Sequence, residues 1–544
     1  MTDGDALYRA IVARPEDDTP RLVYADWLEE NGHEEEAEFI RLECRLEAST
    51  PDLPEYTELT ERCEELRLWL QTYAPKKLRL PKRSLGRLDL SIGSSWWELT
   101  SRGFPWMLNV SQIELRLGAK GVRRLATVIE KAFTILPTRF LVVDFPAIED
   151  LAEFLKQPVV SSIGQLSVST SEQAGDDAAR LIAECRLLRN LRDLTLTFPV
   201  GEAGANALAW SEHLARLEWL GLDTFQLLPA TIRILSAGSW FRRLRKVYLA
   251  DHLSAEAFEE LCRLSPFPEL HTLNLLNNSF PVSSWHTFAR SKSFPKLTTL
   301  NLAGTDMSSG QMEALANAKN INLGLLDLSS CSIGNEGVHA LVTAKWIDSL
   351  HWLDLATNRL GPGAVKRIAK CRKLSNLKYL ALYDNTISGT GLHAIAGSAF
   401  LHNLSTLLLG VTYAKHRNFN SDVCRNFLEK LDLPKLRRLS LSGLPIDARS
   451  VRVLTDKKFR NLTRLELANC KLTDEAMPDL LTSPTLQGLI ELNLQGNSLK
   501  AGVIPLTDKR ILPRLSTCRL FDNSIPGDLY NKIARRRPGV LRLM

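Results

Sequence analysis

The sequence contains many residues that can do chemistry, but it has no pattern that specifies a reaction. P-loop, G-x-G-x-x-G, H-E-x-x-H, G-x-S-x-G and calcium-loop motifs are absent. His33 precedes three glutamates that could join it around a metal, but no second histidine lies at ligand spacing, and a solvated helix face explains the run better. A convergent Ser–His–Asp triad stays open, because geometry defines such triads. We expect no enzymatic activity, no metal and no cofactor.

Aromatic and charged side chains at regularly spaced positions are better candidates for function. Tryptophan, tyrosine and arginine dominate the energetics of protein interfaces, and we expect Trp352, Asp354, Tyr379 and Tyr383 to form the contact centre. The full set predicted to bind a partner is Trp219, Asp223, Lys246, Tyr248, Asp327, Trp352, Asp354, Tyr379, Tyr383, Arg438, Arg464 and Arg519. The alternative is that these side chains only cover a sheet or contact one another across strands.

A repeated pattern positions these residues. The motif L-x-x-L-x-L occurs thirteen times in succession over residues 191–520, with steps of 26 or 27 residues apart from a single step of 32. Only Val247 and Cys518 replace the middle leucine, and both are apolar. This period and this pattern are typical of leucine-rich repeats.

Each repeat predicts one short strand followed by one helix. Leu353 and Leu355 lie two residues apart and point into the core, whereas Trp352 and Asp354 point to the opposite face. Segments such as 333–346 then show apolar residues at helical spacing. The ninth position carries a small side chain that can hydrogen-bond the turning backbone. It is Asn278, Asn358, Asn385, Asn497, Asn523, Cys331, Cys470, Thr305 or Thr412 in nine repeats.

Such units curve when they stack, because helices are wider than strands. We therefore predict an α/β leucine-rich-repeat solenoid, a horseshoe with a parallel sheet inside and helices outside, preceded by a small all-α module. Thirteen strands spaced about 4.8 Å apart give a concave strip roughly 60 Å long. A strip of that length can hold a protein partner.

The repeat resembles the ribonuclease-inhibitor-like class of leucine-rich repeats over residues 191–544. The resemblance implies an intracellular horseshoe that binds proteins on its concave face. Upstream, we interpret residues 91–190 as degenerate repeats or a cap, with 102–111 as a possible start of the sheet. The 32-residue step predicts an inserted loop at 413–426, which is either functional or a tolerated insertion.

Residues 1–50 predict an acidic module of two helices around a turn, with Pro20 near the start of a helix and Asn31-Gly32 at its end. The module resembles the short repeat-companion domain that precedes leucine-rich repeats in large bacterial families, which implies association with repeats but no assigned activity. The matched positions are Asp18, Pro20, Arg21, Leu22, Tyr24, Ala25, Asp26, Trp27, Leu28, Gly32, Ala37, Glu38, Phe39, Ile40 and Leu42.

Four side chains of this module are candidates for a polar site. They are Arg21, Tyr24, Asp26 and Trp27. The alternative is that the two aromatic rings fill a small core and that Arg21 makes a structural ion pair.

Residues 51–90 predict a linker, with an amphipathic helix at 55–73 and a basic segment at 75–87. The helix carries Leu59, Cys63, Leu66 and Leu70 along one stripe. Residues 1–66 have a net charge of −14, from 20 acidic and 6 basic residues, and residues 67–544 have +20, from 42 acidic and 62 basic residues. The basic segment predicts a solvated linker that attracts the acidic module. The sequence leaves open whether that module docks as an autoinhibitor or recruits another protein.

We expect a cytoplasmic location and no membrane association. The N-terminus lacks a basic and apolar signal sequence, no apolar run approaches 18 residues, and nine cysteines without a C-x-x-C pair suggest reduced thiols. The function that we predict is a scaffold for an unidentified protein partner, with the oligomeric state open. The alternative is a nucleic acid or acidic partner bound through residues 75–87 and the arginines.

Overall fold

The computed structural model describes most of the chain. The described residues are 3–49, 55–73, 91–92, 100–101, 104–105, 107–110, 117–134, 138–222, 227–251, 253–264, 266–411, 419–538 and 540–541. They divide into two compact units. Unit 1 comprises Met1–Thr50, Lys76–Thr305 and Ala318–Asn322, and unit 2 comprises Pro51–Pro75, Asp306–Asn317 and Leu323–Met544. The predicted basic segment 75–87 lies outside the described residues.

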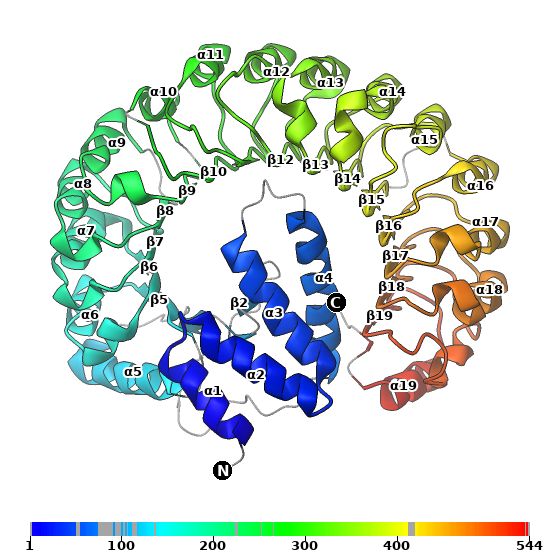
Figure 1. The fold of residues 1–544 in the computed structure, drawn as a ribbon, viewed down its shortest axis with the longest axis horizontal. Helices are drawn as coiled ribbons and strands as arrows, with labels where there is room; N and C mark the ends of the chain where they lie inside the picture. The colour runs from blue at the N-terminus through cyan, green and yellow to red at the C-terminus, as the bar shows by residue number, and fades with distance from the viewer. Residues whose placement is uncertain are drawn as a thin grey trace. The chain divides into compact units, whose positions relative to one another are not determined.

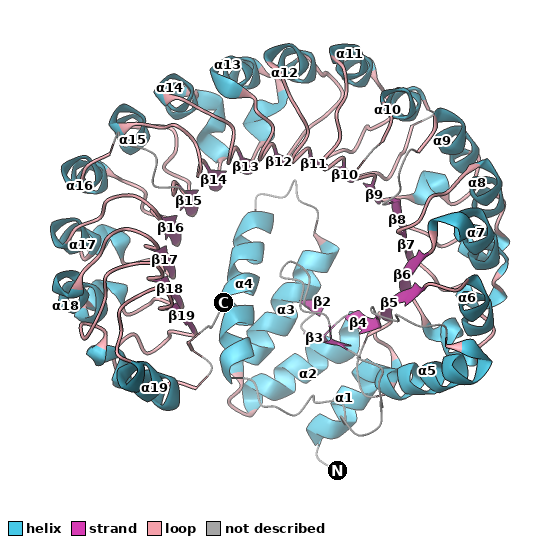
Figure 2. Cartoon of the chain, turned by 180° about the vertical axis from the view of Figure 1, so that it is seen from behind, coloured by secondary structure: helices cyan, strands magenta, loops and turns pink. Residues whose placement is uncertain are grey.

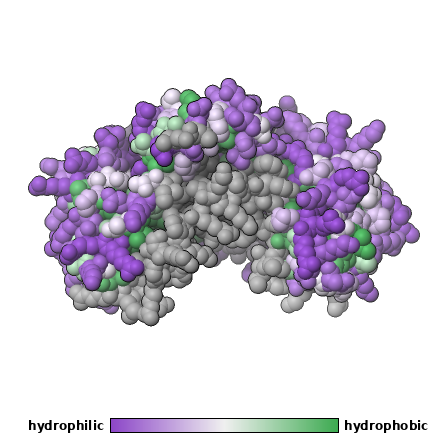
Figure 3. Space-filling view, turned by 90° about the horizontal axis from the view of Figure 1, so that it is seen from below, coloured by the Kyte–Doolittle hydropathy of each residue, from purple (hydrophilic) through white to green (hydrophobic). Residues whose placement is uncertain are grey.

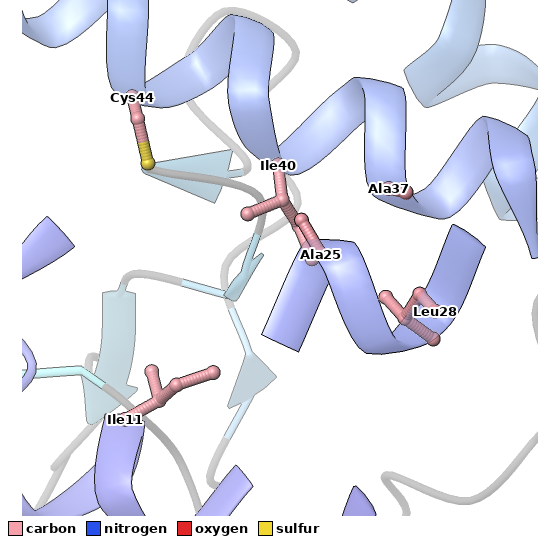
Figure 4. Packing of buried hydrophobic residues seen from close by; sticks show 6 residues of the cluster. All are labelled: Ile11, Ala25, Leu28, Ala37, Ile40 and Cys44. Atoms are coloured by element: carbon pink, nitrogen blue, oxygen red, sulfur yellow. The ribbon is translucent and has the colours of Figure 1, made fainter. Parts of the chain in front are cut away.

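Unit 1 begins with a helical module, α1 (Asp3–Ala13), α2 (Asp18–Glu30) and α3 (Glu34–Ala48). The prediction of two helices is therefore wrong, since α1 is a separate helix. α2 begins earlier than expected because the Asp17 side chain accepts a hydrogen bond from the Thr19 N–H at 2.9 Å and caps the helix. Figure 4 shows the side chains of the buried core, which are Ile11, Ala25, Leu28, Ala37, Ile40 and Cys44.

The rest of unit 1 is a stack of strand–helix repeats. Strands β4 to β11 pair in parallel with their successors in chain order. The strands are β1 (Ser91–Ile92), β2 (Thr100–Ser101), β3 (Phe104–Pro105), β4 (Met107–Val110), β5 (Phe140–Phe145), β6 (Gln165–Thr170), β7 (Asp193–Leu196), β8 (Trp219–Leu222), β9 (Lys246–Tyr248), β10 (Thr272–Asn274) and β11 (Thr299–Asn301). The helices are α5 (Gly118–Phe133), α6 (Ile148–Phe154), α7 (Gly175–Glu184), α8 (Glu202–Ala209), α9 (Pro229–Ser236), α10 (Ala255–Arg263) and α11 (Val282–Arg290).

Unit 2 repeats the same arrangement, and strands β12 to β19 again pair in parallel in chain order. The strands are β12 (Leu325–Asp327), β13 (Trp352–Asp354), β14 (Tyr379–Ala381), β15 (Thr406–Leu408), β16 (Arg438–Ser440), β17 (Arg464–Glu466), β18 (Glu491–Asn493) and β19 (Thr517–Arg519). The helices are α4 (Tyr56–Tyr73), α12 (Ser309–Ala316), α13 (Gly334–Thr343), α14 (Pro362–Lys370), α15 (Gly389–Ala396), α16 (Ser421–Lys430), α17 (Ala448–Leu454), α18 (Met477–Thr482) and α19 (Gly527–Arg536).

Within each unit the strands lie on the inner side of an arc and the repeat helices on its outer side (Figures 1 and 2). The motif leucines fill the space between these two layers, and Leu353 and Leu380 are fully buried. This arrangement confirms the predicted fold class, a leucine-rich-repeat solenoid preceded by an all-α module. The inner surface of each strand row is left for side chains that the core does not need.

Buried asparagines hold the turn after several of the strands. Asn358 is fully buried, donates from Nδ2 to the carbonyls of Leu328 and Ala356, and accepts at Oδ1 from the N–H groups of Cys331 and Ile333. Three of these four bonds join neighbouring repeats. The predicted role of the ninth position is thus confirmed at Asn358, and Asn385 and Asn497 bond in the same way.

The insertion predicted as a loop at 413–426 is in part a helix. Residues 412–418 lie outside the described residues, but α16 begins at Ser421. The Asn420 side chain accepts a hydrogen bond from the Val423 N–H at 2.8 Å and so caps that helix. The loop prediction is wrong from Ser421 onward.

The residues that are coloured in Figure 3 are mostly hydrophilic, and hydrophobic side chains form only small separate groups among them. Among the described residues, the large hydrophobic side chains that are well exposed are few. They are Leu22, Val23, Trp210, Leu228, Val282, Tyr383 and Ile504. No helix in the described part of the chain is long and apolar enough to cross a bilayer.

Candidate functional site

Five predicted residues meet on the inner surface of unit 2, and we call them the aromatic–acidic patch. They are Asp327, Trp352, Asp354, Tyr379 and Tyr383. The parallel register places Asp327 beside Asp354 and Trp352 beside Tyr379. The rings of Trp352 and Tyr379 stack, with centroids 4.4 Å apart and planes inclined by 15°. The four residues expected to form the contact centre therefore lie close together, and Asp327 lies beside them.

The two carboxyl groups of the patch are poorly solvated. Asp354 is only 8% exposed, and its burial, reinforced by the neighbouring Asp327, raises its pKa to about 7. The Ala356 N–H at 2.8 Å and the Tyr379 hydroxyl at 3.5 Å donate to Asp354 but do not offset this effect. Burial also raises the pKa of Asp327, although the Ser329 N–H and hydroxyl donate to it.

This combination of groups suits a positively charged ligand. Tyr383 is 38% exposed, while Trp352 and Tyr379 are half-buried, so the rings remain accessible. A cation gains energy over an aromatic face and beside a carboxylate, and it would favour the ionised forms of Asp327 and Asp354. The patch can thus recognise a basic side chain.

The predicted arginines do not form a patch of uncompensated charge. Arg438 donates from Nε and Nη2 to Glu466, at 3.1 and 2.7 Å, and Arg519 lies 3.2 Å from Glu491. Arg464 is 5% exposed and donates to Glu64 of α4 at 2.6 Å. The expectation of exposed arginines is corrected here, because each of the three is paired with a carboxylate of the same chain.

Helix α4 lies on the inner surface of unit 2. The carboxylates of Glu58, Glu61, Glu64 and Glu65, which we call the acidic face of α4, contact side chains at the start of strands β14 to β17. Glu58 pairs with Lys378 at 2.6 Å, and Glu61 accepts from the hydroxyls of Ser405 and Thr406 at 2.8 and 2.6 Å. Farther along the helix, α4 lies next to β19.

The strongest of these contacts was not predicted from the sequence. Arg437 donates from both Nε and Nη2 to the two oxygens of Glu65, at 3.0 and 2.5 Å, and the Thr463 hydroxyl also donates to Glu65 at 2.5 Å. Burial alone would raise the pKa of Glu65, but Arg437 holds it below its ordinary value. In the same way Arg464 outweighs burial and lowers the pKa of Glu64.

The stripe predicted on the opposite face of this helix is buried. Leu59, Cys63 and Leu66 are each less than a tenth exposed. The side chain of Leu70 is outside the described part of the structure. The helix therefore has one buried apolar face and one acidic face.

The predicted binding residues of unit 1 are arranged differently. The Lys246 Nζ lies 5.4 Å from the ring centroid of Trp219, and Tyr248 follows on the same strand, half-buried. Asp193 on β7 is hydrogen-bonded by Gln165, and burial raises its pKa to about 7. Asp223 lies outside the described residues.

The candidates in the helical module have structural contacts. Tyr24 and Trp27 stack at 5.8 Å and pack against the module core. Arg21 is buried and donates to the backbone carbonyl of Asp17, while Asp26 pairs with Arg41 at 2.6 Å. These contacts favour the packing interpretation of the module. Leu22 and Val23 of α2, by contrast, are exposed.

Within the described residues, no group of three or more His, Cys, Asp or Glu side chains is placed to hold a metal ion. His33 lies 3.9 Å from Glu36 on the surface of the module. Among the residues that the structure describes, this pair is not part of a group of three or more side chains that could hold a metal.

The Leucine Rich repeat family matches the sequence at residues 319–342, 373–396 and 460–477. No curated protein matches the chain. Among solved structures, an internalin from Listeria monocytogenes is 21% identical, over 62% of this chain and 82% of its own, with a TM-score of 0.39. A leucine-rich-repeat protein from Leptospira interrogans is 20% identical over 79% and 99% of the two chains, with a TM-score of 0.38. The complex of TLR13 with ssRNA13 gives 15% identity over 77% and 56%, with a TM-score of 0.42.

Proposed function

We propose that this chain, a leucine-rich-repeat protein, is a non-enzymatic scaffold that binds a protein partner on the inner strand surface of unit 2. The observation that carries the proposal is the aromatic–acidic patch. Four of its side chains come from three neighbouring strands and stand in register, and Tyr383 follows the third of these strands. The partner that fits it presents a lysine or arginine side chain.

The energetics of the patch support a role in binding. Asp327 and Asp354 lose solvation without gaining a cation among the contacts of the described residues, so the fold stores an unfavourable interaction at this point. A partner's basic side chain would relieve it, and half-buried rings lose little entropy when a partner covers them. Strain held at one surface position is a common property of binding sites.

The binding set that we propose keeps five of the residues predicted from the sequence. Trp352, Asp354 and Tyr379 form its centre, and Asp327 and Tyr383 its border. The unit 1 group of Trp219, Lys246 and Tyr248 and the module residues stay secondary candidates. The nucleic-acid alternative is not carried further, because Arg438, Arg464 and Arg519 are each paired with a carboxylate.

Four other expectations stay proposals. A cytoplasmic location rests on the sequence, whose nine cysteines include no C-x-x-C pair. The repeat-companion origin of the module, its bacterial source and the domain boundaries at residues 50, 90 and 190 rest on the sequence alone.

The test compares capture of partners by the full chain and by a Trp352→Ala/Tyr379→Ala variant. Proteins recovered from lysate of the native cell, with and without nuclease treatment, would be identified by mass spectrometry. Truncation of two aromatic anchors costs about 2 kcal/mol or more, so we expect at least roughly a thirtyfold loss of affinity for the partner. Trp210→Ala is the matched control, since Trp210 is 69% exposed and belongs to unit 1.

Equal recovery by the double variant and the wild-type chain would refute the proposal, provided that thermal melting shows both to be folded. Recovery that disappears only with nuclease treatment would point instead to a nucleic-acid ligand. In that case the aromatic–acidic patch is not the binding centre.

A further inference from the structure

The acidic face of α4 matches the strand spacing of the surface on which it lies. An α-helix advances about 5.4 Å per turn, and neighbouring strands lie about 4.8 Å apart. Carboxylates three or four residues apart on one helix face therefore meet successive strands. Glu58 contacts the start of β14, Glu61 the start of β15, and Glu65 the starts of β16 and β17.

The groups that receive these carboxylates occupy equivalent positions in consecutive repeats. Lys378, Ser405, Arg437 and Thr463 each directly follow the first leucine of a motif, and Thr406 and Arg464 occupy the next position. We call these six residues the helix-binding edge. These donors lie at the starts of four parallel strands, β14 to β17, and occupy the same motif positions in each repeat.

The contact between α4 and this edge is polar and incompletely satisfied. Among the described residues, the buried Oε2 of Glu61 has no hydrogen-bond partner, and neither do Nε and Nη2 of Arg464. Arg464 thus uses only Nη1, although a guanidinium can bind a carboxylate through two nitrogens. A helix that placed a carboxylate within hydrogen-bond distance of Nε and Nη2 of Arg464 would satisfy two donors that α4 leaves unsatisfied.

The covalent connection of α4 to the chain explains how an imperfect ligand can occupy the edge. A segment tethered to its site has an effective concentration in the millimolar range, so weak contacts suffice to hold it. Solvent-accessible ion pairs contribute little, and buried ones spend most of their attraction on desolvation. The polar contacts between α4 and the edge are therefore open to competition.

The edge is also continuous with the aromatic–acidic patch. Lys378 of the edge directly precedes Tyr379 of the patch, and Tyr379 stands in register with Thr406 of the edge. A partner that covers the patch thus reaches the residues that α4 contacts.

We infer that the helix-binding edge is a docking surface for an acidic helix of the protein partner, and that α4 occupies this surface in the absence of the partner. The inference rests on the proposed function and extends it by naming the partner's chemistry. The partner helix carries carboxylates with the spacing of Glu58, Glu61 and Glu65. Binding displaces α4 from the strands.

The test uses the full chain and a labelled peptide with the sequence of residues 55–73, whose binding is followed by fluorescence anisotropy. The variant Glu61→Gln/Glu64→Gln/Glu65→Gln weakens the docking of α4 in the chain. We expect this variant to bind the peptide at least tenfold more tightly than the wild-type chain does. The single variant Glu64→Gln, which removes only the contact with Arg464, should give a smaller gain and serves if the triple variant does not fold.

Two controls separate the pattern from general charge attraction. A peptide of the same composition in scrambled order should bind the triple variant at least tenfold more weakly. Adding Arg437→Glu/Arg464→Glu to that variant should abolish the gain, whereas Arg449→Glu/Arg460→Glu, on exposed arginines of the same unit outside the strands, should preserve it.

Several results would overturn the inference. The inference is wrong if the 55–73 peptide and its scrambled form bind equally. It is also wrong if neither the triple variant nor Glu64→Gln binds the peptide more tightly than the wild-type chain, or if the two arginine pairs have the same effect. A dimer of the wild-type chain that dissociates in the Glu64→Gln variant would assign the edge to a second copy. These peptide measurements do not use the natural partner. If the Trp352→Ala/Tyr379→Ala variant captured the partner as well as the wild-type chain does, the proposed function would be refuted but the peptide results would still hold. If the peptide binds as expected but the triple variant captures no more partner, the displacement of α4 is refuted.

Discussion

Replacement of Asp354 by asparagine should stabilise the protein at alkaline pH. Asp354 sits on β13 with burial and the neighbouring Asp327 both opposing its ionisation. Asparagine has nearly the same shape and keeps an oxygen that can accept the Ala356 N–H. The substitution therefore removes the charge while leaving the strand and its turn intact.

The direction follows from the protons bound in each state. Native Asp354 has a pKa of about 7 against an ordinary value of 3.8, so between these pH values the native chain holds a proton that the unfolded chain has released. The free energy of unfolding of the wild-type chain must fall as the pH rises through this range. The difference corresponds to about 4 kcal/mol at most, part of which belongs to the coupling with Asp327.

The measurement is urea unfolding of the wild-type chain and the Asp354→Asn variant at several pH values from 4 to 8.5. We expect similar unfolding free energies near pH 4 and a growing advantage of the variant up to about pH 8. Asp348→Asn, at an exposed position shortly before β13, is the control. Parallel pH profiles for wild type and Asp354→Asn would show that Asp354 ionises normally and would refute the electrostatic argument for the patch.

Two further predictions concern the repeats themselves. Asn358→Ala removes four buried hydrogen bonds and should lower the free energy of unfolding by about 3–4 kcal/mol. Hydrogen exchange at the amides of Cys331 and Ile333 should become faster. The control Asn376→Ala, at an exposed position, should cost less than about 1 kcal/mol. Phe258→Ala should cost about 3–5 kcal/mol in thermal or urea unfolding, because its fully buried ring lies 4.3 Å from that of Phe280; a change below about 1 kcal/mol would contradict this packing.

The repeat architecture could be predicted because it depends on interactions that recur at a fixed sequence distance. Leu353 and Leu380 occupy the same motif position in successive repeats, and both are buried. Asn358 and Asn385 likewise hydrogen-bond the turns of successive repeats. Thirteen copies of one pattern average out the exceptions, such as Val247. The patch followed from the same periodicity, since a position in the motif fixes the face on which its side chain lies.

The arginine pairs could have been found by extending that reasoning to neighbouring strands. Ser440 stands in register with Glu466, so Arg438, two residues before Ser440, is the diagonal neighbour of Glu466. Diagonal neighbours on one face of a sheet are within reach of long side chains. The ion pair between Arg438 and Glu466 was therefore accessible to a comparison of motif positions, but not to an interpretation of each strand alone.

The docking of α4 could not be predicted in this way. Glu64 and Arg464 are 400 positions apart, and no periodic pattern relates a helix outside the repeats to particular strands. The sequence shows an acidic segment and a basic repeat region, and this charge division permits many arrangements. The spacing of the glutamates becomes informative only once the strand spacing and the identity of the edge residues are known.

The patch and the edge together restrict the partner more than either does alone. Along unit 2 the order is acidic at β12 and β13, then donor-rich from β14 to β17, and α4 runs from the start of β14 toward β17. Consider a partner helix that binds in the same direction as α4. If it extends one or two turns on the N-terminal side of its first edge-binding carboxylate, it reaches Asp354 and Asp327. Basic residues at those positions would meet the two desolvated carboxyl groups, and the acidic residues that follow would meet Arg437 and Arg464. A helix with the reverse order of charges would be repelled at both ends, so we expect the inner surface to select the polarity of its ligand as well as its charge.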